Sequence, residues 1–82
     1  MGMRAVAIDR SSVIDRIAYD EASTTLRISF RDTGDYLYFD VPAELFDRFH
    51  GADSAGSFFN EHIKDRYRYR RDRARRRFGL NA

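Results

Sequence analysis

The sequence has no cysteine, one proline and only two histidines in 82 residues. Without cysteine the chain cannot form a disulfide or a cysteine-based zinc site, which excludes a disulfide-stapled secreted mini-protein. The two histidines, His50 and His62, are separated by a stretch rich in phenylalanine and charge, which is poor material for a metal site. The sequence therefore predicts no metal ion and no cofactor.

Long apolar runs and catalytic motifs are also missing. No segment approaches the roughly 18 apolar residues that a membrane helix needs, and the N-terminus lacks an apolar signal segment. We therefore expect a cytoplasmic protein with no membrane partner. The glycines are isolated rather than grouped in a phosphate-binding loop, and no motif ties a serine to either histidine. The sequence thus predicts no catalytic residue and no enzyme activity.

What the chain does have is aromatic residues and an uneven distribution of charge. Seven Phe and five Tyr can supply a compact core to a single domain this small. Residues 1–63 hold six arginines against eleven acidic residues, a net charge of −5, whereas residues 64–77 carry +7. The C-terminal end of the chain is therefore strongly positive, whereas the preceding residues are negative overall.

The first half of the chain indicates β-structure. Three segments are rich in β-branched and aromatic residues and alternate apolar with polar positions: residues 12–19, 24–31 and 35–41. The alternation fails at Asp15, which predicts either a bulge after Val13-Ile14 or a strand that begins near Arg16. Asp32-Thr33-Gly34 reads as a hairpin turn, since Gly34 can adopt the positive φ that such turns need.

The apolar alternation of the last two segments also predicts how they pair. We expect Phe30 to lie opposite Leu37, so that Leu37 is buried and its neighbours Tyr36 and Tyr38 are exposed on the other face. This register leaves the two tyrosines beside arginines of the preceding segment. The residues expected in the core are Leu26, Ile28, Phe30, Leu37, Phe39, Val41, Phe46, Phe49, Phe58 and Ile63.

Two short helices are expected after the strands. Pro42 suits the first turn of a helix and Gly51 its end. The second helix should begin near Ser54 or Ser57, either of which can cap it, and Asn60 should bond the backbone where the helices meet. We expect Ser54 and Asn60 to be structural rather than ligand-binding.

The resulting order is β-β-β-α-α. It predicts an α+β fold, a three-stranded antiparallel meander with two short helices packed on one face. Residues 1–10 should form a frayed segment, residues 11–69 the domain and residues 70–82 a basic tail.

Tyrosines flanked by arginines on an open sheet face can stack on unpaired bases and bind phosphates. The same face could instead be ordinary solvated sheet or a protein contact, because tyrosine favours strands and is enriched at interfaces. The candidate nucleic-acid-binding residues are Arg27, Arg31, Tyr36, Tyr38, Lys64, Arg66, Arg68, Tyr69, Arg70 and Arg71.

The segment RYRYRRDRARRR, residues 66–77, could likewise be a nucleic-acid contact or a solvated surface. As a helix it would be charged on every side. As an extended arm it would place Tyr67 and Tyr69 on one side and arginines on the other, a pattern typical of arms that fold on RNA or DNA. A solvated tail is the alternative. A net charge of +7 over residues 64–77, next to −5 over residues 1–63, is however hard to explain by solubility alone.

Several motifs together resemble the KTSC domain, a module named for its place at the C-terminus of some lysyl-tRNA synthetases. They are Tyr36-Leu37-Tyr38, Phe39-Asp40-Val41-Pro42, Ser54-Ala55-Gly56-Ser57-Phe58-Phe59-Asn60 and Ile63-Lys64-Asp65-Arg66-Tyr67. The resemblance covers roughly residues 11–69. Two departures are Ala55, where many relatives carry a basic residue, and the arginine-rich end, which is not part of the module.

The family has no established activity, and its synthetase setting suggests RNA binding. The resemblance and the charge pattern together predict a non-catalytic module that binds RNA, tRNA among the candidates, or another nucleic acid. A protein–protein adaptor that uses the same tyrosines is the alternative hypothesis.

Overall fold

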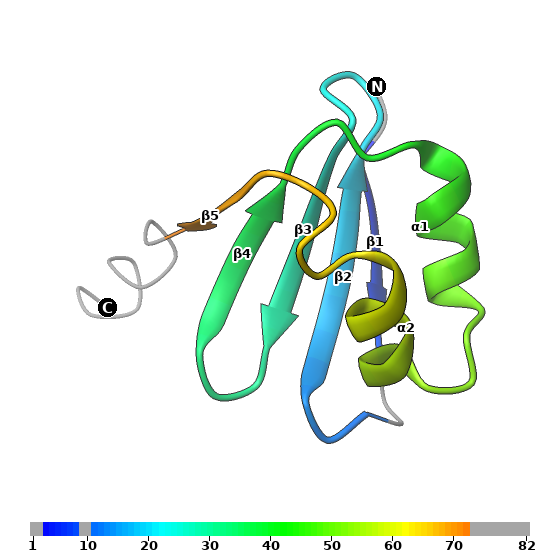
Figure 1. Cartoon of the computed structure of the whole chain (residues 1–82), viewed down its shortest axis with the longest axis vertical. Helices are drawn as coiled ribbons and strands as arrows, with labels where there is room; N and C mark the ends of the chain where they lie inside the picture. Colours follow the sequence, from blue (N-terminus) through cyan, green and yellow to red (C-terminus); the bar gives the residue numbers. More distant parts are fainter. Residues whose placement is uncertain (1–2, 9–10, 73–82) are drawn as a thin grey trace.

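The computed structural model describes residues 3–8 and 11–72, in which five strands form one antiparallel sheet with two helices on one face (Figure 1). The elements are β1 (Met3–Ala7), β2 (Ile14–Asp20), β3 (Thr25–Phe30), β4 (Gly34–Tyr38), α1 (Ala43–His50), α2 (Ala55–His62) and β5 (Tyr69–Asp72). The strands follow one another across the sheet in chain order. The α+β class and the two helices are confirmed, but the prediction of three strands is wrong. In the described part of the chain, neither helix is long and apolar enough to span a membrane.

The two additional strands lie at the two edges of the sheet. β1, in a segment expected to fray, pairs antiparallel with β2 along its whole length. β5, formed by the start of the arginine-rich stretch, pairs with β4 and places Tyr69 opposite Tyr38. The sheet therefore continues to Asp72, past the domain end predicted from the sequence. The rest of the predicted tail, residues 73–82, lies outside the described residues.

The pairing of β3 with β4 differs from the predicted register by three residues. Residues 31–33 form the turn, and Gly34, with φ of 99°, is the first residue of β4 and lies opposite Phe30. The apolar pattern had predicted Leu37 opposite Phe30, three positions further along the chain. Because successive side chains of a strand point to opposite faces, this shift exchanges the two faces of β4.

The exchange of faces buries the tyrosines. Tyr38 is 4% exposed and Tyr36 is partly buried against the core, whereas Leu37 lies on the other face of the sheet, opposite Arg27. The expected platform of exposed tyrosines on the open face is therefore wrong. Phe39 lies beyond the end of β4 and is only partly buried.

The core fills the space between the sheet and the two helices. The Tyr19 ring stacks on Phe46 with centroids 5.5 Å apart, and its hydroxyl donates a hydrogen bond of 2.5 Å to the backbone oxygen of Val41. Phe49 and Phe58 stack 5.3 Å apart and join α1 to α2. The predicted core residues that are buried are Leu26, Ile28, Val41, Phe46, Phe49, Phe58 and Ile63. The expected bulge in β2 is also present, because the register shifts between Ile14 and Arg16.

The helix boundaries follow the expected capping residues. α1 begins after Pro42 and ends at Gly51. The Ser54 hydroxyl accepts a hydrogen bond of 3.2 Å from the backbone N–H of Ser57, so Ser54 is the N-cap of α2 and Ser57 is not. Among the residues that the structure describes, the Asn60 side chain has no hydrogen-bond partner, and the expected bond to the backbone is not found.

Replacing Ser54 with alanine should therefore lower the free energy of unfolding by about 1 kcal/mol, because α2 loses its capping hydrogen bond. Ser57→Ala is the matched control: it removes an exposed hydroxyl but keeps the donor N–H. Urea denaturation of both variants measures the difference. Equal losses in the two variants would contradict the assigned cap.

Candidate nucleic-acid interface

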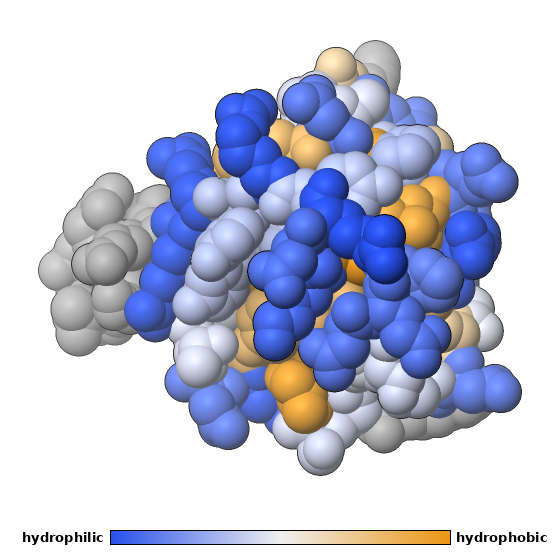
Figure 2. Space-filling view, in the orientation of Figure 1, coloured by the Kyte–Doolittle hydropathy of each residue, from blue (hydrophilic) through white to orange (hydrophobic). Residues whose placement is uncertain are grey.

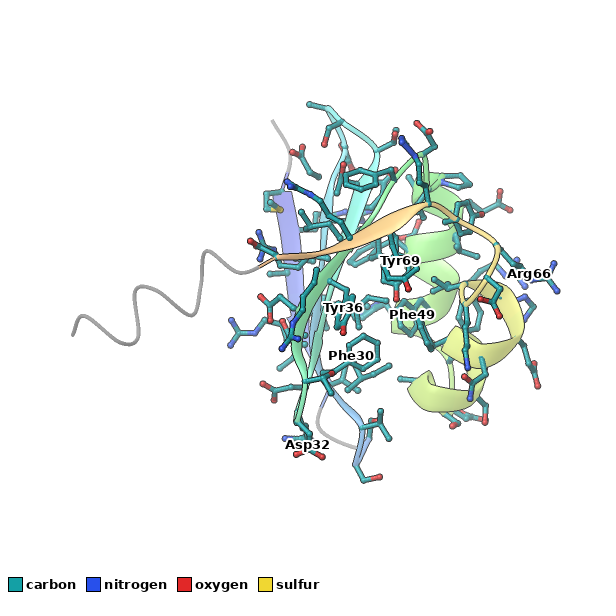
Figure 3. The ribbon with its side chains drawn as sticks, turned by 60° about the vertical axis from the view of Figure 1, so that its left-hand side comes forward. Phe30, Asp32, Tyr36, Phe49, Arg66 and Tyr69 are labelled. Atoms are coloured by element: carbon teal, nitrogen blue, oxygen red, sulfur yellow. The ribbon has the colours of Figure 1, made fainter. Side chains whose placement is uncertain are left out.

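Five aromatic rings gather where β4 and β5 face the end of α2. Figure 3 shows three of them, Phe30, Tyr36 and Tyr69, on the side of the sheet that faces the helices. They line a groove of about 240 Å³, which we call the tyrosine groove. Its lining residues are Phe30, Thr33, Tyr36, Tyr38, Phe59, Lys64, Asp65 and Tyr69.

The rings of the tyrosine groove contact one another in a continuous series. Tyr69 stacks on Tyr38 with centroids 5.4 Å apart and lies 5.9 Å from Tyr36. Phe30 makes edge contacts with Tyr36 at 5.6 Å and with Phe59 at 5.3 Å. Tyr38 is almost fully buried, but Tyr69 is 55% exposed. Tyr69 therefore presents an aromatic surface to solvent at the edge of an apolar hollow.

Cations surround this aromatic surface. Lys64 lines the groove, and the Arg71 guanidinium lies 5.9 Å from the centroid of Tyr36 and donates a hydrogen bond of 2.6 Å to the backbone oxygen of Thr33. Arg68 does not line the groove; its guanidinium lies 5.2 Å from the Phe39 centroid and 3.8 Å from the Asp40 carboxylate. Figure 2 shows hydrophilic side chains gathered on the face over the α2–β5 connection, with hydrophobic patches between them.

Two of the predicted arginines are held elsewhere by carboxylates. Arg27 lies on the open face of the sheet, 3.1 Å from Asp35 and 2.6 Å from Asp72. Burial alone would lower the pKa of Arg27, but the hydrogen bonds to these two carboxylates raise it. Arg31 pairs with Asp15 at 3.4 Å. Neither arginine lines the tyrosine groove.

Arg66 and Arg70 are also separate from the groove. Arg66 points away from the sheet (Figure 3) and donates a hydrogen bond of 3.1 Å to the backbone oxygen of Glu61. Arg70 lies opposite Leu37 in the register, on the open face. The structure thus brings together five of the ten candidate residues, which are Tyr36, Tyr38, Lys64, Tyr69 and Arg71.

Sequence reasoning missed four residues of the groove, Phe30, Thr33, Phe59 and Asp65, as members of a site. No signal in the sequence separates Phe59 from Phe58, because adjacent helix positions can both be buried, as Leu45 and Phe46 are. Phe58 is buried against Phe49, and Phe59 turns toward the tyrosines.

The groove also raises the pKa of Tyr38 to about 12, chiefly through burial and then through the neighbouring Tyr69, Tyr36 and Asp65. The hydroxyl therefore stays protonated throughout the neutral range. The neutral hydroxyl can both donate and accept hydrogen bonds.

The raised pKa of Tyr38 predicts a loss of stability in alkali. The folded state holds this proton more tightly than the unfolded chain, so its contribution is complete below pH 10 and is lost as the pH rises toward about 12. Tyr38→Phe removes the titrating group and keeps the ring. Over this interval the free energy of unfolding should fall more steeply for the natural chain than for Tyr38→Phe, and parallel pH profiles would contradict the assignment.

A second, wider hollow of about 760 Å³ lies between the end of β1 and the start of α2. Polar residues line it, with Ser11, Ser57 and His50 among them. In residues 3–8 and 11–72 no serine is hydrogen-bonded to His50, as a nucleophile and its base would be. No group of three or more His, Asp or Glu in the same residues could hold a metal ion.

The fold and the groove define a small α+β domain with an aromatic groove at one edge of its sheet. The KTSC domain model matches residues 10–67, and the chain belongs to this family. The structure is similar to the crystal structure of a KTSC domain protein from Yersinia pestis, with a TM-score of 0.81 and 35% identity, over 87% of this chain and 99% of that one.

Two curated relatives match the same part of the chain. A protein of Tsukamurella paurometabola is 41% identical over 58 residues, which are 71% of this chain and 87% of that protein. A lysine–tRNA ligase of Nostoc punctiforme is 34% identical over 58 residues. The match covers 71% of this chain but only 10% of the ligase.

Proposed function

We propose that this domain binds single-stranded RNA, with a base stacked on Tyr69 in the tyrosine groove and phosphates held by the neighbouring cations. One observation carries the proposal: the exposed ring of the groove belongs to the strand that leads into the arginine-rich end. Stacking and phosphate contacts would therefore lie along one continuous path of the chain.

The two kinds of contact would contribute differently. Stacking of a base on an aromatic ring is worth about 1–3 kcal/mol and depends little on salt. Phosphate contacts from Lys64 and Arg71 weaken as salt rises, because binding releases counterions from the strand. The sequence adds four arginines between residues 73 and 77. We expect these to increase affinity without choosing among sequences.

The name of the Nostoc relative supports RNA as the partner class. That protein is a lysine–tRNA ligase and carries a segment similar to this domain. A domain of this kind beside a tRNA-charging enzyme would act as an accessory contact to single-stranded parts of tRNA. For the present chain, RNA with unpaired bases is the corresponding ligand, because only an unpaired base can enter the groove.

Titration of a labelled single-stranded RNA at several salt concentrations tests the proposal. Deleting residues 73–82 removes four arginines and keeps β5, so the slope of log affinity against log salt should become shallower by up to about three, at about 0.7 per phosphate. Replacing the four arginines with glutamine is the matched control for chain length and should give the same change. A duplex of the same sequence should bind more weakly. Absence of RNA binding by the intact chain at low salt would overturn the proposal.

A further inference from the structure

Asp65 is an unexpected residue in the tyrosine groove. It lines the groove between Lys64 and Arg66, in the turn that joins α2 to β5. Its φ of 65° places it in the left-handed region, which is uncommon for residues other than glycine. Within the described part of the chain it forms no ion pair, although two cations flank it in the sequence.

Asp65 lines the same groove as Tyr36, Tyr38 and Tyr69, and its carboxylate acts electrostatically on the Tyr38 hydroxyl. After burial and the two other tyrosines, it is a further cause of the raised pKa of Tyr38. A carboxylate at this point weakens any contact with phosphate, because like charges repel. In the groove such a carboxylate would suit a group that donates hydrogen bonds better than it would suit a phosphate.

An ionised carboxylate only accepts hydrogen bonds, and it can accept two at once from a suitable edge. Guanine presents a ring N–H and an amino group side by side and so fits both oxygens. Cytosine offers its amino group alone. Uracil places its single N–H between two carbonyl oxygens, which a carboxylate repels.

We propose that the tyrosine groove selects an unpaired guanine, an inference that rests on the proposed RNA function. The guanine would stack on Tyr69, and the N–H donors of the guanine would bond to Asp65. The groove volume of about 240 Å³ is below the roughly 300–1,000 Å³ of pockets for drug-sized ligands, so it suits one ring system. An aromatic site with a carboxylate also suits a quaternary ammonium group, but Lys64 and Arg71 would repel such a cation.

The test uses the full chain and short oligouridines that carry guanine, cytosine, adenine or uracil at one central position. The natural chain should bind the guanine oligonucleotide about ten-fold more tightly than the uracil one, as a bidentate contact would give. Asp65→Asn should remove most of this preference while keeping the backbone, because asparagine also tolerates a left-handed conformation.

Asp40→Asn is the matched control. Asp40 is also exposed and left-handed, with φ of 59°, and it does not line the groove. Its replacement should change the affinity for all four oligonucleotides equally and leave the guanine preference intact.

The outcomes separate the two proposals. Equal affinity of the natural chain for the four oligonucleotides, or a guanine preference that survives Asp65→Asn, would overturn the base selection and leave RNA binding standing. If the natural chain bound none of the four oligonucleotides, both the base selection and the RNA-binding function would be overturned. Tight binding of a proline-rich peptide with no RNA binding would assign the groove to a protein partner and also overturn the inference.

Discussion

Replacing Phe49 with alanine should cost about 3–5 kcal/mol of unfolding free energy, as large-to-small changes of buried phenylalanine do. Phe49 is fully buried and stacks on Phe58, so the change leaves a cavity between α1 and α2. Small domains are held together by about 5–15 kcal/mol in total. We therefore expect the Phe49→Ala protein to be largely unfolded or to unfold at much lower urea concentrations.

Phe39→Ala is the control for this experiment. Phe39 is of the same residue type, but it is only partly buried and lies under the Arg68 guanidinium beyond the end of β4. Its loss should cost roughly 1 kcal/mol. If Phe39→Ala proved as damaging as Phe49→Ala, the pairing of β3 with β4 described above would be wrong.

Tyr69→Ala should have the largest effect on RNA binding. Removing the exposed ring takes away stacking worth about 1–3 kcal/mol per base, and the loss should persist at high salt. Deletion of residues 73–82 should behave in the opposite way, with a loss of affinity that shrinks as salt rises. Measuring both variants over the same salt series separates the aromatic from the ionic contribution.

Tyr69→Phe is the matched control because it keeps the ring and removes only the hydroxyl. Its affinity for RNA should stay close to that of the natural chain. Since Tyr69 also stacks on Tyr38, urea denaturation of each variant has to show a folded protein under the binding conditions. A Tyr69→Ala protein that is folded and binds RNA normally at high salt would exclude stacking at this position.

The helices and most of the core could be predicted from the sequence because local patterns determine them. Phe46 and Phe49 lie at helical spacing, and Pro42 and Gly51 mark the ends of α1. The family motifs were equally local. The bulge in β2 was also visible, as a break in the alternation of polar and apolar residues at Asp15.

The register of β4 could not be predicted, because both faces of this strand are apolar enough to be buried. Tyr36 and Tyr38 compete with Leu37 and Phe39, and only the length of the turn decides between them. The turn of residues 31–33 sets Gly34 opposite Phe30, and this register puts the tyrosines on the core side. The tyrosine groove was missed for the same reason.

The edge strands depend on partners distant in the sequence. β5 lies in a run of arginines, and it is held by pairing with β4 and by the ion pair between Arg27 and Asp72, 45 residues apart. Neither the pairing with β4 nor this ion pair can be predicted from the local sequence. β1 likewise has a weak pattern and is ordered by β2.

The central claim is that the tyrosine groove receives an RNA base, and nuclear magnetic resonance of the tyrosine rings tests it most directly. The ring protons of Tyr69 and Tyr36 should shift on addition of a short guanine-containing RNA at high salt, because a stacked base changes the magnetic environment of the rings beside it. Arg27 and Arg70, on the open face of the sheet, should be much less affected. Shifts confined to that face, with the tyrosine rings unchanged in the RNA-bound protein, would contradict the account.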